Sequence, residues 1–274
     1  MPARVDELTL ERPRSLKAAL SMLAGDPNLT PIAGCTDVYV GLHFGTVKEQ
    51  RFIDLWRLDE LRGIALDRGR LRIGALTTYS EIIGSKLVTR RLPMLVAAAR
   101  EVGGAQIQNR GTLGGNIANA SPAGDTLPVL AAAGADVILR SARGQRSVPF
   151  DSFYTGYRAS VRQPDELIVA VEFPAVDGRQ WWRKVGTRRA QAISKIMIAG
   201  VRGPGDVRIA FGSVGPTVVL ATQAAAILRR GGTVADAQAA LATEIAPIDD
   251  VRSTREYRAR VAANLLAEFW SATE

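Results

Sequence analysis

The segment GTLGGNIANASPAGD, residues 111–125, holds four glycines, two asparagines and no aromatic residue in fifteen positions. Backbone this bare can bury little apolar surface, whereas 47% of the whole chain is hydrophobic. Glycine lets successive backbone N–H groups converge on one point, and it lets an anion approach without meeting a Cβ atom. The segment therefore favours a phosphate-binding turn.

A second segment upstream, IAGCTD at residues 32–37, has the same character and directly follows strand-like residues. Two such turns could hold the two phosphates of a dinucleotide through their amides. For either segment alone, the plainer alternative is that Gly114-Gly115 forms a tight turn and Gly34 a bulge. Neither is a Rossmann or Walker motif, because no G-x-G-x-x-G opens a helix and no G-K-[ST] occurs.

Composition indicates a globular protein with one large or two smaller domains, since the 274 residues include 23% charged residues. The apolar runs are shorter than the roughly 20 residues of a membrane-spanning helix. The charged N-terminus also lacks the apolar core of a signal peptide. We therefore expect a cytoplasmic protein without a membrane span. The net charge of +8 is scattered along the chain, which argues against nucleic-acid binding and favours an anionic cofactor or acidic partner.

The chain has one cysteine, Cys35, and one histidine, His43. Structural zinc sites take four Cys or His ligands and iron–sulfur clusters take four thiolates, so this chain alone can build neither. We predict no metal site, no disulfide and no catalytic side chain. Any metal redox chemistry must therefore belong to another chain.

Local patterns predict alternating helices and strands in the first part of the chain. Ser15 should cap a helix, and Thr78 with Glu81 forms a capping box at the start of another. A hairpin should turn at residues 67–69, and a helix over 127–133 should end at Gly134.

A polar turn after residue 174 suggests a domain boundary. Strand-like runs over 181–185, 196–201 and 207–212 are followed by helical patterns, which indicates a small α+β domain. Its last helix should begin with a capping box formed by Ser253 and Glu256.

Longer stretches carry a resemblance to a known family. They are QIQNRGTLGGNIANASPAGDTLPVL (106–130), PIAGCTDV (31–38), FYTGYR (153–158), KVGTRRAQAIS (184–194) and GSVGPT (212–217). Together they resemble the FAD-binding subunit of the molybdenum hydroxylases, the family of xanthine dehydrogenase and carbon monoxide dehydrogenase. They occur in the family's order and cover nearly the whole chain.

The resemblance implies an α+β fold with two domains. Residues 1–176 would form a two-lobed FAD-binding domain of the vanillyl-alcohol oxidase (PCMH) type, with lobes at about 1–55 and 56–176. Residues 177–274 would form a small α+β C-terminal domain of the CO dehydrogenase flavoprotein type.

The resemblance also implies the FAD-binding residues. Those expected around the pyrophosphate are Ile32, Ala33, Gly34, Cys35, Thr36, Asp37, Val38, Thr112, Leu113, Gly114, Gly115 and Asn116. Ser121 and Asp125 should approach the ribityl chain, and Ile168 and Lys184 should line the isoalloxazine and adenine pockets. From the residues alone, Asp125 is equally suited to cap the next helix, and Lys184 to an exposed strand position.

Two positions depart from the family pattern. Cys35 stands where the family's A-G-G-T-D has its second glycine, and Gln108 stands where an arginine often precedes the asparagine. The backbone angle at Cys35 is therefore in question. One charge-assisted phosphate contact, worth about 1.5 to 3 kcal/mol, could be missing at Gln108.

The family implies an electron-transfer role. Electrons would come from a molybdopterin large subunit through [2Fe–2S] clusters on a small subunit to this FAD, and then pass to NAD or another acceptor. The assembly would be a dimer of heterotrimers. Two alternatives stay open: a free-standing flavin-dependent reductase or oxidase, and a non-catalytic nucleotide-binding assembly module.

Overall fold

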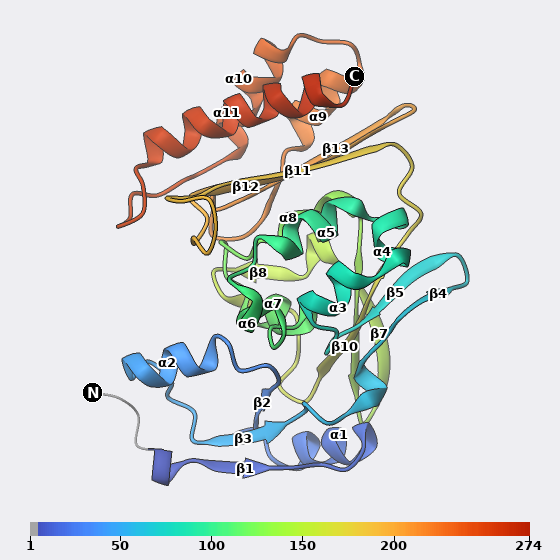
Figure 1. Cartoon of the computed structure of the whole chain (residues 1–274), viewed down its shortest axis with the longest axis vertical. Helices are drawn as coiled ribbons and strands as arrows, with labels where there is room; N and C mark the ends of the chain where they lie inside the picture. The colour runs from blue at the N-terminus through green and yellow to red at the C-terminus, as the bar shows by residue number, and fades with distance from the viewer. Residues whose placement is uncertain (1–4) are drawn as a thin grey trace.

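The computed structural model describes residues 5–274 and has a mixed α+β architecture (Figure 1). The first lobe consists of η1 (Val5–Glu7), β1 (Thr9–Glu11), α1 (Leu16–Gly25), β2 (Thr30–Ile32), α2 (Val38–Phe44) and β3 (Arg51–Asp54). Its strands pair in parallel in the order β1–β3–β2. Ser15 caps α1 as expected, because its hydroxyl accepts a hydrogen bond from the Ala18 amide.

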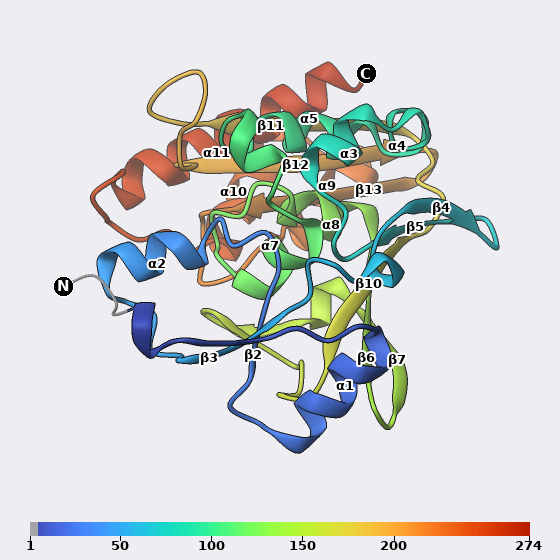
Figure 2. The ribbon, with the colours of Figure 1, turned by 60° about the horizontal axis from the view of Figure 1, so that its bottom comes forward.

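Helix α1 packs the first lobe onto the second. Its buried side chains, Leu16, Ala19, Leu20 and Leu23, share one hydrophobic cluster with Ile53 of β3 and with Ile138 and Val169 of the next sheet. Figure 2 shows α1 beside the strands of that sheet. The two lobes are therefore joined by a common core.

The second lobe is built on a five-stranded antiparallel sheet in the order β4–β5–β10–β6–β7. Its strands and 3-10 helices are β4 (Ile64–Asp67), β5 (Arg70–Gly74), β6 (Asp136–Ser141), β7 (Gly144–Pro149), β10 (Leu167–Phe173), η2 (Asp59–Leu61) and η3 (Phe150–Ser152). A small hairpin adds β8 (Tyr154–Gly156) and β9 (Ala159–Ser160). The hairpin predicted at residues 67–69 is confirmed as the β4–β5 pair.

Helices cover this sheet on the side of the C-terminal domain (Figure 1). They are α3 (Tyr79–Gly84), α4 (Lys86–Arg91), α5 (Pro93–Arg100), α6 (Ala105–Gln108), α7 (Leu113–Asn119) and α8 (Leu127–Ala133). The Thr78–Glu81 capping box is confirmed, and Gly134 ends α8 in the left-handed conformation that glycine favours. Every residue of α8 is buried, because the helix lies between the two domains.

The C-terminal domain is an antiparallel sheet covered by helices on one face. Its elements are β11 (Arg179–Val185), β12 (Ile196–Gly203), β13 (Asp206–Gly212), β14 (Val219–Leu220), α9 (Thr222–Arg229), α10 (Val234–Glu244) and α11 (Arg255–Ala272). The other face of the sheet meets α5 and α8 (Figure 1). The sheets change between Phe173 and Arg179, although the boundary at residue 176 itself stays a prediction.

The capping box expected at Ser253 is wrong by one residue. Thr254 is the N-cap of α11, and its hydroxyl accepts from the Tyr257 amide. The Ser253 amide is instead held in a turn by the Asp250 carboxylate. The amide that a Glu256 side chain would bind in a capping box at Ser253 is therefore already bound in the turn.

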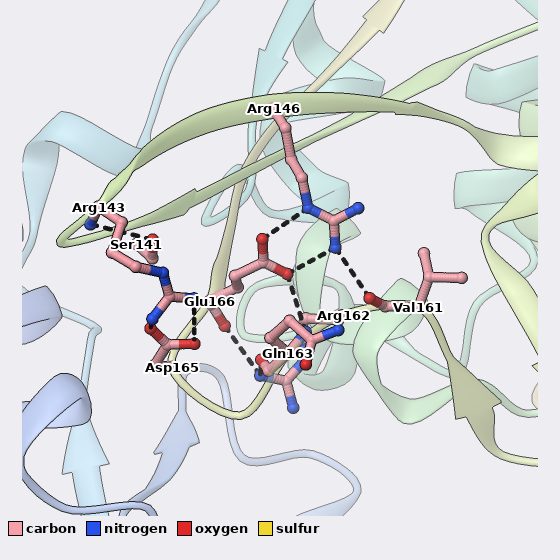
Figure 3. A network of polar contacts seen from close by, with 8 residues as sticks. All are labelled: Ser141, Arg143, Arg146, Val161, Arg162, Gln163, Asp165 and Glu166. Atoms are coloured by element: carbon pink, nitrogen blue, oxygen red, sulfur yellow. Dashed lines mark hydrogen bonds and ion pairs between the residues drawn. The ribbon is translucent and has the colours of Figure 1, made fainter.

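An ionic network fixes the entry to the central strand β10 (Figure 3). The Glu166 carboxylate, whose side chain is 7% exposed, accepts from Arg146 at 2.6 Å and from the Gln163 amide at 2.8 Å. Arg143 pairs with Asp165, and Arg162 donates to the Glu166 carbonyl. The hydrogen bond from Arg146 is the main reason why the pKa of Glu166 lies below its usual range.

Candidate cofactor site

The segment Ile32 to Val38 links β2 to α2 and offers free backbone donors. Within residues 5–274, none of the five amides from Gly34 to Val38 donates a hydrogen bond. Cys35 lies between them with φ at +62°, the left-handed conformation that favours glycine. Successive free amides around a left-handed residue form an anion-binding concavity. The family's glycine at this position is thus matched in backbone angle.

The second segment, Thr112 to Asn116, is the start of helix α7 and not a tight turn. Four of its five amides donate within the chain: Leu113 to Thr77, Gly114 to Ala75, and Gly115 and Asn116 to Thr112. The expectation that both segments present free amides is therefore wrong for these four. The reason is that two of them tie α7 to the residues that follow β5, and the other two close the first turn of α7 on its N-cap.

Glycines in the second segment allow close packing. A Cβ atom added to Gly114 would lie 2.7 Å from the Ala75 Cβ, and one added to Gly111 would lie 2.9 Å from the Tyr79 ring. Gly115 differs because it is exposed and meets only the Thr112 hydroxyl, at 2.8 Å. The second segment therefore offers a bare surface at Gly115.

The first segment contacts the residues on either side of the second. A Cβ atom added to Gly34 would lie 1.8 Å from the Arg110 carbonyl oxygen. The Asn119 amide donates to the Asp37 carboxylate at 3.1 Å, and Arg158 donates to Asn119. Burial raises the pKa of Asp37, and Arg158 opposes that shift. The first segment is thus packed against both flanks of the second, which lies 74 or more positions further along the chain.

Asp125 and Lys184 bind each other across the domain interface. Lys184 Nζ of β11 lies 2.8 Å from the Asp125 carboxylate, and the exposed fractions of the two side chains are 5% and 11%. Ser194 also donates to Asp125, and Lys184 donates to the Glu101 carbonyl. Burial raises the pKa of Asp125, and Lys184 opposes that shift.

Both plainer interpretations of these residues are wrong. Thr126 is the N-cap of α8 without a side-chain bond, so Asp125 does not cap the helix. Lys184 is buried because the face of β11 that carries it packs against the first domain.

Two predicted residues remain, Ser121 and Ile168. The Ser121 hydroxyl accepts from the Ala123 amide, and Ser121 is half-buried. Ile168 lies in β10 beside a register shift and is 8% exposed. Direct FAD contact by any of the sixteen residues stays a prediction.

Sequence reasoning missed Trp56 and Arg110, which border the first segment. The Arg110 guanidinium carbon lies 3.8 Å from the centre of the Trp56 ring. Arg110 directly precedes Gly111, but it lies 54 positions after Trp56, and no local pattern joins two residues so far apart.

Two family models match the chain. Residues 6–176 match the FAD-binding domain in molybdopterin dehydrogenase, and residues 183–273 match the C-terminal domain of the CO dehydrogenase flavoprotein. The chain belongs to this family of FAD-binding subunits. The expected two-lobed FAD-binding domain with a C-terminal α+β domain is thereby confirmed.

Relatives of this FAD-binding subunit align over most of their length. The glyceraldehyde dehydrogenase medium chain of Sulfolobus acidocaldarius is 32% identical, over 93% of this chain and 94% of the relative. The xanthine dehydrogenase FAD-binding subunit of Escherichia coli O157:H7 is 32% identical, over 92% and 91%. A solved structure of carbon monoxide dehydrogenase from Hydrogenophaga pseudoflava superimposes with a TM-score of 0.92 at 27% identity, covering 100% of this chain and 98% of that one.

The FAD-binding subunit is thus an oxidoreductase subunit with FAD as its cofactor. The free amides of Gly34 to Val38, around a residue with a positive φ, fit an anionic group such as a pyrophosphate. In residues 5–274 no three His, Cys, Asp or Glu side chains gather as a metal site. No helix in that range is long and apolar enough to span a membrane.

Proposed function

We propose that this FAD-binding subunit carries electrons within a cytoplasmic molybdenum hydroxylase complex. Electrons would arrive from [2Fe–2S] clusters on a small partner subunit, which receives them from a molybdopterin large subunit, and would leave to NAD or another acceptor. Bound FAD would supply the redox chemistry. The chain's own residues would bind and orient the FAD and exclude water from it.

The observation that carries this proposal is the contact between the first segment and the residues that flank the second. Gly34 packs on the Arg110 carbonyl and Asp37 accepts from Asn119, so the five free amides are anchored to the residues that flank Thr112–Asn116. Main-chain amides can satisfy phosphate oxygens with little reorganisation when they are already placed. The sixteen residues named from the sequence are proposed as the lining of this site.

Gly115→Val tests the site. Gly115 is exposed, and a Cβ atom there would meet a single atom, the Thr112 hydroxyl at 2.8 Å, so we expect the change to disturb the cap of α7, to keep the rest of the fold and to obstruct the approach of FAD. We expect purified wild-type chain to bind FAD at one equivalent and Gly115→Val to lose it, with the same far-UV circular dichroism. Full FAD content in the variant would contradict the proposed site.

Purification from the source tests the proposed partners. Co-purification with a cysteine-rich small subunit and a molybdopterin large subunit, as a dimer of heterotrimers, would support the complex. A lone flavoprotein that is bleached anaerobically by NADH would favour the free-standing reductase. A colourless chain that cannot be reconstituted with FAD would favour the assembly module.

A further inference from the structure

Arg110 is held beside the first segment by an aromatic ring. Its guanidinium carbon lies 3.8 Å from the centre of the Trp56 ring, which is within the range of a cation–π contact. Trp56 is half-buried two residues after the end of β3, and its backbone amide donates to the Asp54 carboxylate at 2.9 Å. The backbone that carries the ring is therefore held to the end of β3, and the guanidinium of Arg110 stacks on the ring.

The polar edge of Arg110 is free. Within residues 5–274 its guanidinium donates no hydrogen bond and makes no ion pair, although it has five N–H donors. Arg62 also lies over Trp56, at 4.4 Å, but it donates to the Leu76 and Trp56 carbonyls and lies 3.8 Å from the Glu81 carboxylate. Of these two arginines, Arg110 is the one without a protein partner for its N–H groups in the described residues.

Arg110 lies where that anion would be held. Its carbonyl touches Gly34, the first residue of the five free amides. Its charge acts on the Cys35 thiol, whose pKa is raised by burial and lowered in part by Arg110. Asp54 influences the same thiol but makes no ion pair with Arg110 in the described chain. The Arg110 guanidinium thus lies near the free amides of Gly34 to Val38, and no carboxylate of the described residues is paired with it.

Gln108 cannot supply the same contact. Its side-chain amide donates to the Arg100 carbonyl at the end of α5, at 3.0 Å. That bond ties α6 to α5 and uses the polar end of the side chain.

We infer that Arg110, oriented by Trp56, binds a phosphate oxygen of the FAD pyrophosphate together with the free amides of Gly34 to Val38. This inference rests on FAD binding at the proposed site. A stacked, planar guanidinium loses little side-chain freedom when it binds, and it can offer two parallel N–H groups to one phosphate.

The test compares FAD affinities of the 274-residue chain by flavin fluorescence titration. Arg110→Gln should weaken FAD binding by about 10- to 100-fold, as expected for a charge-assisted hydrogen bond. Arg110→Lys keeps the charge but lacks the planar guanidinium. Its FAD affinity should lie between those of the wild type and Arg110→Gln. Arg57→Gln is the matched control, since it removes the same charge from an exposed side chain next to Trp56.

Two further measurements separate a phosphate contact from a structural effect. ADP, which carries the pyrophosphate without a flavin, should itself bind more weakly to Arg110→Gln than to Arg57→Gln by a similar factor, measured as its own dissociation constant by direct calorimetric titration. FAD affinity should also depend less on salt in Arg110→Gln than in the wild type. Trp56→Leu, checked for folding by circular dichroism, should also weaken FAD binding, but by less than Arg110→Gln does.

The outcomes are distinct. Wild-type chain that fails to bind FAD would refute the proposed site as a whole. Wild-type binding with Arg110→Gln within about twofold of Arg57→Gln would refute the role of Arg110 alone. A weakened FAD affinity with an unchanged ADP dissociation constant would also refute it, because the lost contact would then not be to the pyrophosphate.

Discussion

Replacing Gly34 by alanine should separate the two segments of the site. The new Cβ atom would lie 1.8 Å from the Arg110 carbonyl oxygen, 2.6 Å from its carbonyl carbon and 3.2 Å from the Gly111 nitrogen. A carbon and a carbonyl oxygen need about 3.3 Å, so one segment must move by roughly 1.5 Å. All three atoms are backbone, which leaves no flexible side chain to turn aside.

The expected cost follows from this geometry. Forcing extra atoms into a packed site usually costs about 1 to 3 kcal/mol, and the backbone contact puts Gly34→Ala near the upper end. For a chain of this size, that corresponds to a melting temperature lower by about 6 to 10 °C. Hydrogen bonds to phosphate require about 2.7 to 3.2 Å, so the same shift should weaken FAD binding at least about tenfold.

Thermal unfolding by circular dichroism, with and without FAD, measures both effects. Gly25→Ala makes the same chemical change at the end of α1, where a Cβ atom would meet no atom within 4 Å. That control should unfold within about 0.5 kcal/mol of the wild type and bind FAD normally. The reasoning would be refuted if Gly34→Ala matched Gly25→Ala in melting temperature and FAD affinity.

Three further predictions follow from single contacts. Cys35→Gly should raise the free energy of unfolding by up to about 1 kcal/mol, because φ at +62° strains a residue with a Cβ atom; a clear loss in urea titration would contradict this. Lys184→Met should cost about 3 kcal/mol by leaving the buried Asp125 carboxylate without a cation, and a loss below about 1 kcal/mol would argue against the interface pair. Arg146 holds the pKa of Glu166 below 4.5, so stability should fall as the pH drops below about 4.5 and through the folded pKa. In Glu166→Gln the urea unfolding midpoint should fall less steeply with decreasing pH. An equal pH dependence in the variant and the wild type would exclude Glu166 as the cause of the acid destabilisation.

The helix starts show how far local patterns reach. Thr78 and Glu81 satisfy each other within four residues, so the capping box was predicted correctly from sequence. At Ser253 the same pattern failed because Asp250, three residues earlier, takes the Ser253 amide first. Local hydrogen bonds therefore predict a helix start only where no neighbouring turn competes for the same groups.

The candidate site, too, was predicted only in part from the sequence. The glycine and hydroxyl composition of residues 32–37 and 111–125 indicated a phosphate-binding surface, and the resemblance gave the family that the comparisons confirm. The sequence alone did not tell which amides are free. The Gly115 amide donates to Thr112, whereas the amides of Gly34 to Val38 have no partner in the described residues. Both segments contain glycine and hydroxyl residues, so their composition does not distinguish them.

The sequence by itself determined the helix periods, the β4–β5 turn and the scarcity of metal ligands, because each depends on residue types or on neighbours within a few positions. Only the tertiary structure decided that Gly34 meets Arg110, that Asp125 pairs with Lys184, and that Trp56 holds Arg110. Each of these contacts joins residues more than 50 positions apart. Their formation depends on how the lobes and the C-terminal sheet pack, and no local pattern encodes that packing.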